Sequence, residues 1–454
     1  MDYLGILKFK MKSEKGISMK KCASDIFQRI TRLYLILMVT LFLLYTGLQG
    51  YAGITEAKYR MFLVICGGYA AVMLLLLVES TVIGGRKVRN IRSIIQAMSW
   101  IQRMMMIFVV LTWISALTSS YFPQTIIGAS RYEGALTITI YCVCFFLVRA
   151  YGRIDKVLIW AFAAAVSAFD LICLIQLYGG NPLSLYPAGY GYADAYTAYS
   201  GAYLGTIGNV DLLAAFLCLV ISAFWVTMLR GYDRRRFLLT VPLILSVFVL
   251  VKMHVLAGFV GVFGGAVIAS AVVIPMKKHQ RRIAGCILLG VLAAMVIVLY
   301  FCDFGGMFHE IHCMLHGEFD DAFGSGRLHI WKSVLQKVPE HLLLGTGPDT
   351  MIYGGIEVFT RYDAAVGGTI VAQIDTAHNE YLNVLYHQGV PALLVYLGML
   401  TAAAKKWITD SAEHPQIAVL GTMLLCYFIQ AFFGFSMIMT APYAYIVLAL
   451  FDKY

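Results

Sequence analysis

A short polar segment, Asp375-Thr-Ala-His-Asn-Glu-Tyr-Leu382, stands directly before an apolar run that begins near Asn383. An imidazole titrates near neutral pH and suits a general base that takes a proton from a sugar hydroxyl. His378 is therefore a candidate catalytic residue. Asp375 or Glu380 could orient its ring, because a carboxylate fixes the imidazole tautomer. The alternative is a histidine that only caps or packs a helix start.

Two arginines outside the expected spans are further candidates. Arg131 follows a loop with Pro and Gly, and Arg327 precedes a segment of helical periodicity. A guanidinium group is always charged and can bind a diphosphate through two parallel hydrogen bonds. The alternative is an interfacial anchor or a structural ion pair, for example with Glu133 or Asp321.

Two other segments invite a ligand. The run His309-Glu-Ile-His-Cys-Met-Leu-His316 holds three histidines, but the two that flank its glutamate are only three apart, unlike the zinc-protease motif. A helix with scattered histidines is expected there, and no metal site. Residues 186–203 are rich in Tyr, Gly and Ala and contain no Lys or Arg. Their rings could stack on sugars, or form the aromatic part of an irregular outer loop.

The composition indicates a membrane protein. Of 454 residues, 60% are hydrophobic and 13% are charged, and the mean hydropathy is +0.77. Soluble domains have about 25% charged residues. The formal net charge is +10. In a soluble protein this charge would favour nucleic-acid binding, but membrane topology explains it here, so no nucleic-acid partner is expected.

Apolar runs of spanning length recur along the chain and predict an all-α, polytopic transmembrane helical protein with about 12 spans. The runs fall near residues 32–50, 61–83, 100–118, 135–148, 157–178, 207–229, 237–253, 255–275, 283–302, 383–403, 415–434 and 437–451. The expected organisation is a basic cytoplasmic tail (1–30), spans 1–9 (31–302), one large extracytoplasmic loop (303–382) and spans 10–12 (383–454).

Lysine and arginine positions set the orientation. With the N-terminus in the cytoplasm, the 35 Lys and Arg residues all fall in cytoplasmic segments except Lys58, Arg60, Arg131, Lys252, Arg327, Lys332, Lys337 and Arg361. This distribution obeys the positive-inside rule and closes with both termini in the cytoplasm. His378 and both candidate arginines then lie on the outer side.

The large loop is expected to contain one amphipathic helix near the membrane interface. Ile330, Val334, Leu335 and Val338 recur at helical spacing, and Pro339 should end the helix.

Together, several segments between about residue 110 and the C-terminus resemble the O-antigen ligase and Wzy-type polymerase family of bacterial membrane glycan transferases. They are Ser115 to Gly134; Gly205-Thr-Ile-Gly-Asn-Val-Asp-Leu-Leu-Ala214, with Asp211 where the family usually has Asn; Gly326-Arg-Leu-His-Ile-Trp331, Pro339 and Leu344-Gly-Thr-Gly347; His378-Asn-Glu-Tyr-Leu382 and Gly389; and Phe435-Ser436 with Ala441-Pro442. The ordered set is more specific than any single motif.

The resemblance implies a metal-independent, inverting transferase with no cofactor and no nucleotide sugar. Its donor would be a glycan on undecaprenyl diphosphate, and its acceptor a hydroxyl of a glycan or lipid at the outer face of the bacterial cytoplasmic membrane. His378 and Arg327 would be catalytic. The expected substrate-binding residues are Arg131, Asn209, Asp211, Trp331, Asn379 and Asp375. Polysaccharide-assembly proteins are further partners that the resemblance leaves open.

One departure from the family pattern stands near the eighth span. Family members often carry a Ser-Arg-Ala/Gly segment there, whereas this chain has Leu256 at the arginine position, and Lys252 or His254 could supply the charge. Two other functions remain as alternatives. A transporter or flippase of a lipid-linked glycan or polar solute should show repeats and helices broken by Gly or Pro, which the sequence does not indicate. An inactive scaffold should lack His378 or Arg327.

Overall fold

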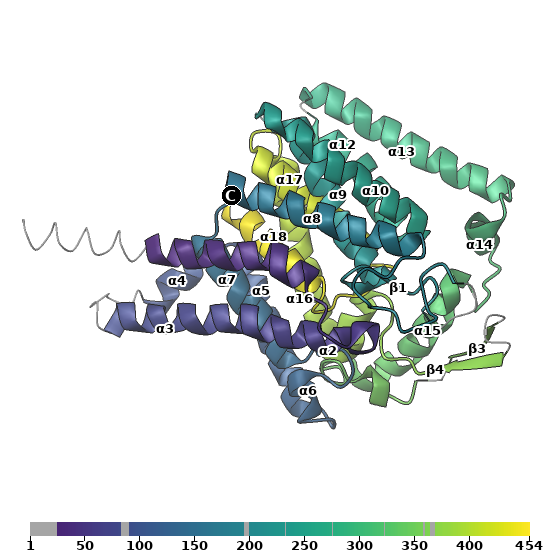
Figure 1. Ribbon diagram of the computed structural model, residues 1–454, viewed down its shortest axis with the longest axis horizontal. Helices are drawn as coiled ribbons and strands as arrows, with labels where there is room; N and C mark the ends of the chain where they lie inside the picture. The colour runs from purple at the N-terminus through teal and green to yellow at the C-terminus, as the bar shows by residue number, and fades with distance from the viewer. Residues whose placement is uncertain are drawn as a thin grey trace, which may run out of the picture.

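The computed structural model describes residues 25–82, 90–194, 199–231, 233–274, 276–321, 323–356, 359–363 and 368–454. Helices dominate these residues, and the long ones gather into a bundle (Figure 1). The membrane helices and intervening turns are a helix at 25–44 that contains η1 (Met38–Phe42), α2 (Gly50–Phe62), η2 (Leu63–Gly67), α3 (Gly68–Val82), α5 (Trp100–Thr118), α7 (Ala135–Tyr151), α8 (Lys156–Leu177), α9 (Val210–Arg230), η3 (Arg234–Leu239), α10 (Thr240–Met253), α11 (Leu256–Phe259), η4 (Val260–Gly264), α12 (Gly265–Val273), α13 (Lys278–Phe301), α16 (Glu380–Asp410), α17 (Pro415–Gln430) and α18 (Ala441–Lys453).

Shorter elements connect or cover the bundle. They are α4 (Ile91–Ala97), α6 (Gln124–Ile127), α14 (Gly306–Leu315), α15 (Phe323–Lys337), η5 (Val338–His341) and η6 (Met351–Tyr353). Two antiparallel ladders pair β1 (Tyr203–Leu204) with β2 (Gly208–Asn209), and β3 (Phe359–Asp363) with β4 (Gly368–Ala372). The polytopic helical class is thus confirmed, although two small ladders join an otherwise helical fold.

A helix lies at each of the expected spans. In the described part of the chain, eight helices are long and apolar enough to cross a membrane, whereas α7 and α17 are apolar but shorter. The exact span count therefore stays a prediction. The expected tail at residues 1–30 stays a prediction, because residues 1–24 lie outside the described residues; residues 25–37 are already helical.

Burial separates the centre of the bundle from its rim. In the apolar 18-residue stretch of α9, 78% of the residues are buried, whereas in that of α13 only 6% are buried. A helix that is apolar on every face belongs in a core, so α9 packs against α10, α11 and α17. The equally apolar α13 stands at the edge of the bundle (Figure 1), where its side chains suit a lipid environment.

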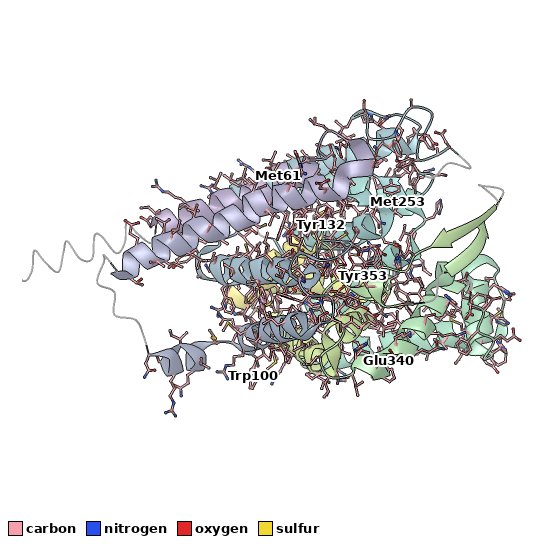
Figure 2. All side chains as sticks on the ribbon, turned by 90° about the horizontal axis from the view of Figure 1, so that it is seen from below. Met61, Trp100, Tyr132, Met253, Glu340 and Tyr353 are labelled. Carbon is pink, nitrogen blue, oxygen red and sulfur yellow. The ribbon has the colours of Figure 1, made fainter. Side chains whose placement is uncertain are left out.

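The bundle has two chemically different ends. At one end, Asp452 of α18 forms an ion pair with Arg149 of α7 and accepts a hydrogen bond from Ser99 Oγ at the start of α5 (2.9 Å). At the other end, α9 and α16 begin and α17 finishes, since the amide of Glu380 donates to Ala431 O at 2.9 Å. Figure 2 shows Trp100 near the first end and Glu340 toward the second.

A helix, α15, lies where the amphipathic helix was expected, and its position at a membrane interface stays a prediction. Val334 and Val338 are buried together with Tyr386 in a small second core, and Ile330 packs against it. The 3-10 turn η5, which contains Pro339, follows α15 directly. Leu335, the fourth apolar residue of the pattern, is 49% exposed and lies outside this small core.

α16 is broken, which the sequence interpretation did not expect. Gly389 has φ 80° and ψ 177°, outside the helical region. At the break the amide of Val390 donates to Leu342 O (2.9 Å), and the amides of Thr346 and Gly347 donate to Tyr386 O (3.0 Å) and His387 O (2.9 Å). The loop before α16 therefore supplies the partners that the broken helix lacks.

Glycine is required where this loop meets the helix. A Cβ at Gly345 would lie 2.2 Å from the carbonyl carbon of His387, and a Cβ at Gly347 would lie 2.6 Å from Ser119 Oγ. The Gly-Thr-Gly motif thus permits a close approach of two main chains. Its role here is to seat the helix that follows His378.

Replacing Gly389 by Ala should destabilise the protein by at least about 2 kcal/mol, because its backbone conformation is nearly restricted to glycine. The new Cβ would also lie 2.4 Å from Leu343 O. Gly398→Ala, in the same helix, is the matched control. Its Cβ would meet only Met104 Sδ at 3.6 Å, so a gain of about 0.5–1 kcal/mol is expected. Thermal melting in detergent measures both, and equal melting temperatures would contradict this account of the break.

Candidate functional site

Asp211 is the centre of a charged cluster between α9, α15 and the segment before α16. Arg327 Nη2 lies 3.3 Å from each carboxylate oxygen of Asp211, and His378 Nδ1 lies 3.5 Å from Oδ2. The three side chains are between 16% and 28% exposed. The residues are far apart in sequence, so the fold brings them together.

Helix capping places Asp211. Asn209 is the N-cap of α9, and its side-chain oxygen accepts hydrogen bonds from the amides of Asp211 (2.9 Å) and Leu212 (3.1 Å). A carboxylate in the first turn is favoured by the helix dipole. Gln430 Nε2 at the end of α17 donates to Asp211 O (3.2 Å). The side chain of Asn209 is therefore used to cap α9, and it positions Asp211 in the first turn of the helix.

A similar cap places His378. Asn379 is the N-cap of α16 and accepts from the amides of Tyr381 (3.0 Å) and Leu382 (3.1 Å). His378 itself has φ 47°, a left-handed conformation that is uncommon outside glycine. Trp331 Nε1 donates to Ala377 O at 2.9 Å, which ties α15 to the same segment. Backbone contacts on both sides thus fix the direction of the imidazole.

Arg131 forms the second half of the site. Its Nε and Nη2 donate to the two oxygens of Asp375 at 3.0 and 2.8 Å, a bidentate pair. The guanidinium lies 4.3 Å from the centre of the Phe435 ring, within cation–π distance. The His378 ring meets the same Phe435 edge to face, with centroids 5.2 Å apart. Phe435 therefore joins the two halves into one site.

Asp349 shapes the loop that carries Arg131. Its Oδ2 accepts hydrogen bonds from the amides of Arg131 (2.8 Å) and Ser130 (3.1 Å), and its Oδ1 accepts from the Ser130 hydroxyl (2.9 Å). Burial raises the pKa of the Asp349 carboxyl, and these hydrogen bonds oppose that rise. Asp349 was missed by sequence reasoning, although it follows the Gly-Thr-Gly motif by two residues.

A cavity of about 70 Å³ lies behind Arg131. Its lining includes the carboxyl groups of Glu133, Asp349, Asp375 and Glu380. This volume is enough for about two water molecules and too small for a sugar ring. Burial raises the pKa of Glu133 well above its ordinary range, so its neutral form, bonded to the Tyr141 hydroxyl at 2.8 Å, is favoured.

The expected ion-pair partners need correction. Arg131 pairs with Asp375 and not with Glu133, and Arg327 pairs with Asp211 and not with Asp321. Asp321 instead lies 2.5 Å from Lys332 Nζ.

The expected orienting residues also need correction. His378 faces Asp211 rather than Asp375 or Glu380. The Glu380 carboxylate accepts the amide of Ser436 at 2.8 Å.

The predicted site residues fall into two groups. Arg131, Asp211, Arg327, Asp375 and His378 bring their charged or titratable groups together around Phe435. The side chains of Asn209, Asn379 and Trp331 are used instead in bonds to the main chain. For those three, a role in substrate binding stays a prediction.

The sequence left Lys252 and His254 as substitutes for the family arginine at Leu256. Gly258, two residues after Leu256, packs against α9, since a Cβ there would lie 3.1 Å from Ala214 Cβ. Lys252 Nζ, however, lies 5.7 Å from the Phe248 ring on its own helix. Neither residue is among the partners of Asp211 in the described contacts, so their role stays a prediction.

The two other candidate segments are occupied by internal contacts. In α14, His312 Nδ1 contacts Leu299 O and His316 Nδ1 contacts His312 O, both at 2.9 Å. No group of three potential metal ligands gathers among the residues that the structure describes. In the tyrosine-rich loop, the rings of Tyr186 and Tyr203 pack on Tyr51 with centroids 4.8 and 5.4 Å apart. These two rings are used in internal packing, and binding of a sugar by this loop stays a prediction.

The structure thus places two arginines, their two carboxylate partners and an imidazole at one end of a bundle of apolar helices, eight of which are long enough to cross a membrane in the described part of the chain. Residues 241–397 match the O-antigen ligase family. The family resemblance is thereby confirmed, and O-antigen ligase-like glycan transfer is the general activity that the match supports. No curated protein sequence matches the chain. The match includes Arg327, Asp375 and His378, whereas Arg131 and Asp211 lie before it.

Replacing Asp349 by Asn should cost about 1–3 kcal/mol of stability, because an amide nitrogen would face main-chain donors that now have an acceptor. Glycan transfer should fall with it, since the Arg131 loop loses its anchor. Melting temperature and transfer rate test both effects.

Glu133→Gln is the control, because an amide oxygen can still accept from Tyr141. The raised pKa of Glu133 means that wild type loses this group's stabilisation as pH rises through the folded-state value. The Gln variant should therefore lose less stability than wild type as pH rises above about 4.5, the ordinary pKa from which this loss begins. Asp349→Asn and Glu133→Gln behaving alike would refute this distinction.

Proposed function

We propose that this protein is a glycosyltransferase that moves an oligosaccharide or polysaccharide from undecaprenyl diphosphate onto an acceptor hydroxyl at the outer face of the cytoplasmic membrane. The observation that carries the proposal is the convergence of Arg327 and His378 on Asp211, with Arg131 joined to them through Phe435. Such a site offers a base beside two cations, which are the groups that this transfer requires.

His378 is the proposed base. Its Nδ1 faces Asp211, so Nε2 is the nitrogen left to take the proton from the acceptor hydroxyl. The acceptor oxygen forms a bond to the anomeric carbon while the bond from that carbon to the diphosphate oxygen breaks. Attack on the face opposite the leaving group inverts the anomeric configuration. The Asp211 carboxylate favours the imidazolium that forms, as a carboxylate does beside a catalytic histidine.

Arg327 and Arg131 are proposed to stabilise the departing diphosphate. Arg327 donates through Nη1 to Gly324 O (2.8 Å) and through Nη2 to Asp211, while its Nε is buried and has no hydrogen-bond partner among the described residues. That Nε is a donor held ready for an anion. The carboxylates of Asp211 and Asp375 hold both guanidinium groups in place before the substrate arrives, so little reorganisation is needed during transfer.

The membrane setting agrees with a lipid-linked donor. The site lies at the ends of α9, α16 and α17, where a lipid chain can stay beside the bundle and its diphosphate can reach the arginines. The orientation expected from the lysine and arginine positions puts this end outside and both termini in the cytoplasm. The acceptor is proposed to be a second glycan or a lipid, and proteins of a polysaccharide-assembly system are proposed partners. No nucleotide sugar, cofactor or metal is required by this proposal.

The break in α16 is a feature that a transporter would share. Here the break is explained by local contacts with the loop at residues 342–347. A transporter or flippase therefore serves as the alternative outcome of the functional test rather than as a second proposal.

Complementation of a deletion strain tests the proposal directly. His378→Ala and Arg327→Ala should each lower transfer by roughly 10²–10⁴-fold, the usual range for removing a base or a charge-stabilising donor. Surface polysaccharide should disappear while lipid-linked donor accumulates on the outer side. Lys332→Gln is the control, because Lys332 lies on α15 with Arg327 but forms an exposed pair with Asp321.

If His378→Ala, Arg327→Ala and Lys332→Gln produce equal amounts of surface polysaccharide at matched membrane levels, the proposed catalytic roles are excluded. Donor trapped on the cytoplasmic side would identify transport instead. The distribution of polymer lengths would separate a ligase from a polymerase, since only a polymerase makes the ladder of repeats.

A further inference from the structure

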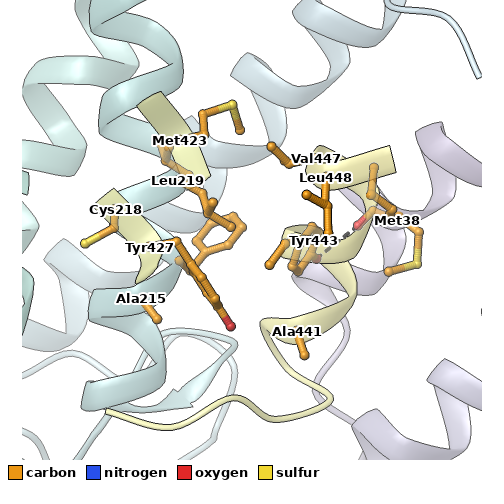
Figure 3. Close-up of a cluster of buried hydrophobic side chains, with 14 of the residues drawn as sticks. Met38, Ala215, Cys218, Leu219, Met423, Tyr427, Ala441, Tyr443, Val447 and Leu448 are labelled. Atoms are coloured by element: carbon orange, nitrogen blue, oxygen red, sulfur yellow. Dashed lines mark hydrogen bonds between the residues drawn. The ribbon is translucent and has the colours of Figure 1, made fainter. Parts of the chain in front are cut away.

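An apolar groove runs along the end of the bundle that lies away from the charged cluster. Its volume is about 340 Å³, and it lies between α9 and α17 on one side and α18, α8 and the helix at 25–44 on the other. Figure 3 shows part of its walls, with Leu219 and Met423 opposite Tyr443 and Val447. Nearly all of the lining is hydrocarbon or aromatic, so the groove is suited to an apolar chain.

The groove is long enough for an acyl chain. Along α9 its lining extends from Phe216 to Arg230, a rise of about 21 Å. Half of a bilayer's hydrocarbon core is about 15 Å thick. One acyl chain of a lipid in the adjacent leaflet can therefore lie along the groove for its full depth.

Arginines stand at the mouth of the groove. Arg230 lines it, and its guanidinium donates only to neutral carbonyls in the described contacts: Val273 O (2.7 Å), Ser411 O (3.1 Å) and Ala412 O (2.8 Å). Arg236 lies beside the lining residue Gly231, where a Cβ would be 3.2 Å from Arg236 Cδ.

Among the residues that the structure describes, neither guanidinium group forms an ion pair with a carboxylate. Arg236 Nε is buried and has no hydrogen-bond partner within the described parts of the chain. The neighbouring acid Asp233 is used by Lys156, at 3.0 Å. An apolar groove that ends at two arginines without a carboxylate is complementary to a lipid with an anionic headgroup.

We propose that this groove binds an anionic phospholipid, with an acyl chain along α9 and the phosphate between Arg230 and Arg236. Asp211 and Arg230 stand at opposite ends of α9, about 28 Å apart. A donor whose diphosphate sits at Arg327 cannot also place it at Arg236, so the groove is a second lipid site. The proposal requires only that the protein lies in a membrane, and it does not depend on the glycan-transfer chemistry.

Native mass spectrometry of the full-length protein in detergent tests the site, with phosphatidylglycerol and phosphatidylcholine added in equal amounts. Wild type should retain phosphatidylglycerol in preference. Arg236→Gln should lower that retention roughly tenfold, because it removes a charge-assisted hydrogen bond. Arg234→Gln is the matched control: Arg234 lies two residues away on η3 and its side chain is exposed, whereas Arg236 packs beside the lining residue Gly231.

Ala223→Leu gives an independent test, because it fills the groove and leaves every charge in place. Retention of both phospholipids should fall in this variant while the melting temperature without lipid stays at or above that of wild type. Equal retention of the two lipids by wild type, or equal loss in Arg234→Gln and Arg236→Gln, would overturn the proposal. Retention of phosphatidylglycerol by Ala223→Leu at the wild-type level would also overturn it. So would the finding that the added phosphatidylglycerol displaces a bound polyprenyl phosphate from the wild-type protein.

Discussion

The carboxylate of Asp211 holds a guanidinium group and an imidazole together at the start of the most buried helix. A half-buried arginine without a counter-charge would be costly, and a half-buried carboxylate equally so. The guanidinium group of Arg327 and the carboxylate of Asp211 therefore stabilise each other when no substrate is bound. The same pairing leaves Arg327 Nε and one nitrogen of His378 for a substrate. Structure and proposed catalysis thus depend on one charge.

The rest of the fold serves to deliver three short segments to that charge. Asparagine caps start both α9 and α16, and they set the directions of Asp211 and His378. The Gly-Thr-Gly loop satisfies the broken helix that follows His378, and Asp349 ties the Arg131 loop to this same loop. Main-chain hydrogen bonds do most of this work. Glycine and asparagine are required there because they permit close approach and tight turns.

Much of this architecture was predictable from the sequence. Span positions follow from the length of apolar runs, and α15 follows from its periodicity. The break at Gly389 was not predictable, because the main-chain partners at the break come from a loop distant in sequence, where Leu342 O accepts from the amide of Val390. The predicted ion-pair partners were wrong for a similar reason. Glu133 is near Arg131 in sequence, but the fold places Asp375 against Arg131. The capping roles of Asn209 and Asn379 could have been recognised, since each precedes a helix with an acidic residue in its first turn.

A double-mutant cycle between Asp211 and Arg327 tests most directly whether one charge unites the site. The rate of lipid-linked donor consumption would be measured for Asp211→Asn, Arg327→Gln and the double variant at matched membrane levels. The account predicts that the double variant is about as slow as Arg327→Gln alone, with a coupling energy in the range of about 0.5–3 kcal/mol. Rate losses that simply add would show that the two residues act independently, and would contradict the central role of Asp211.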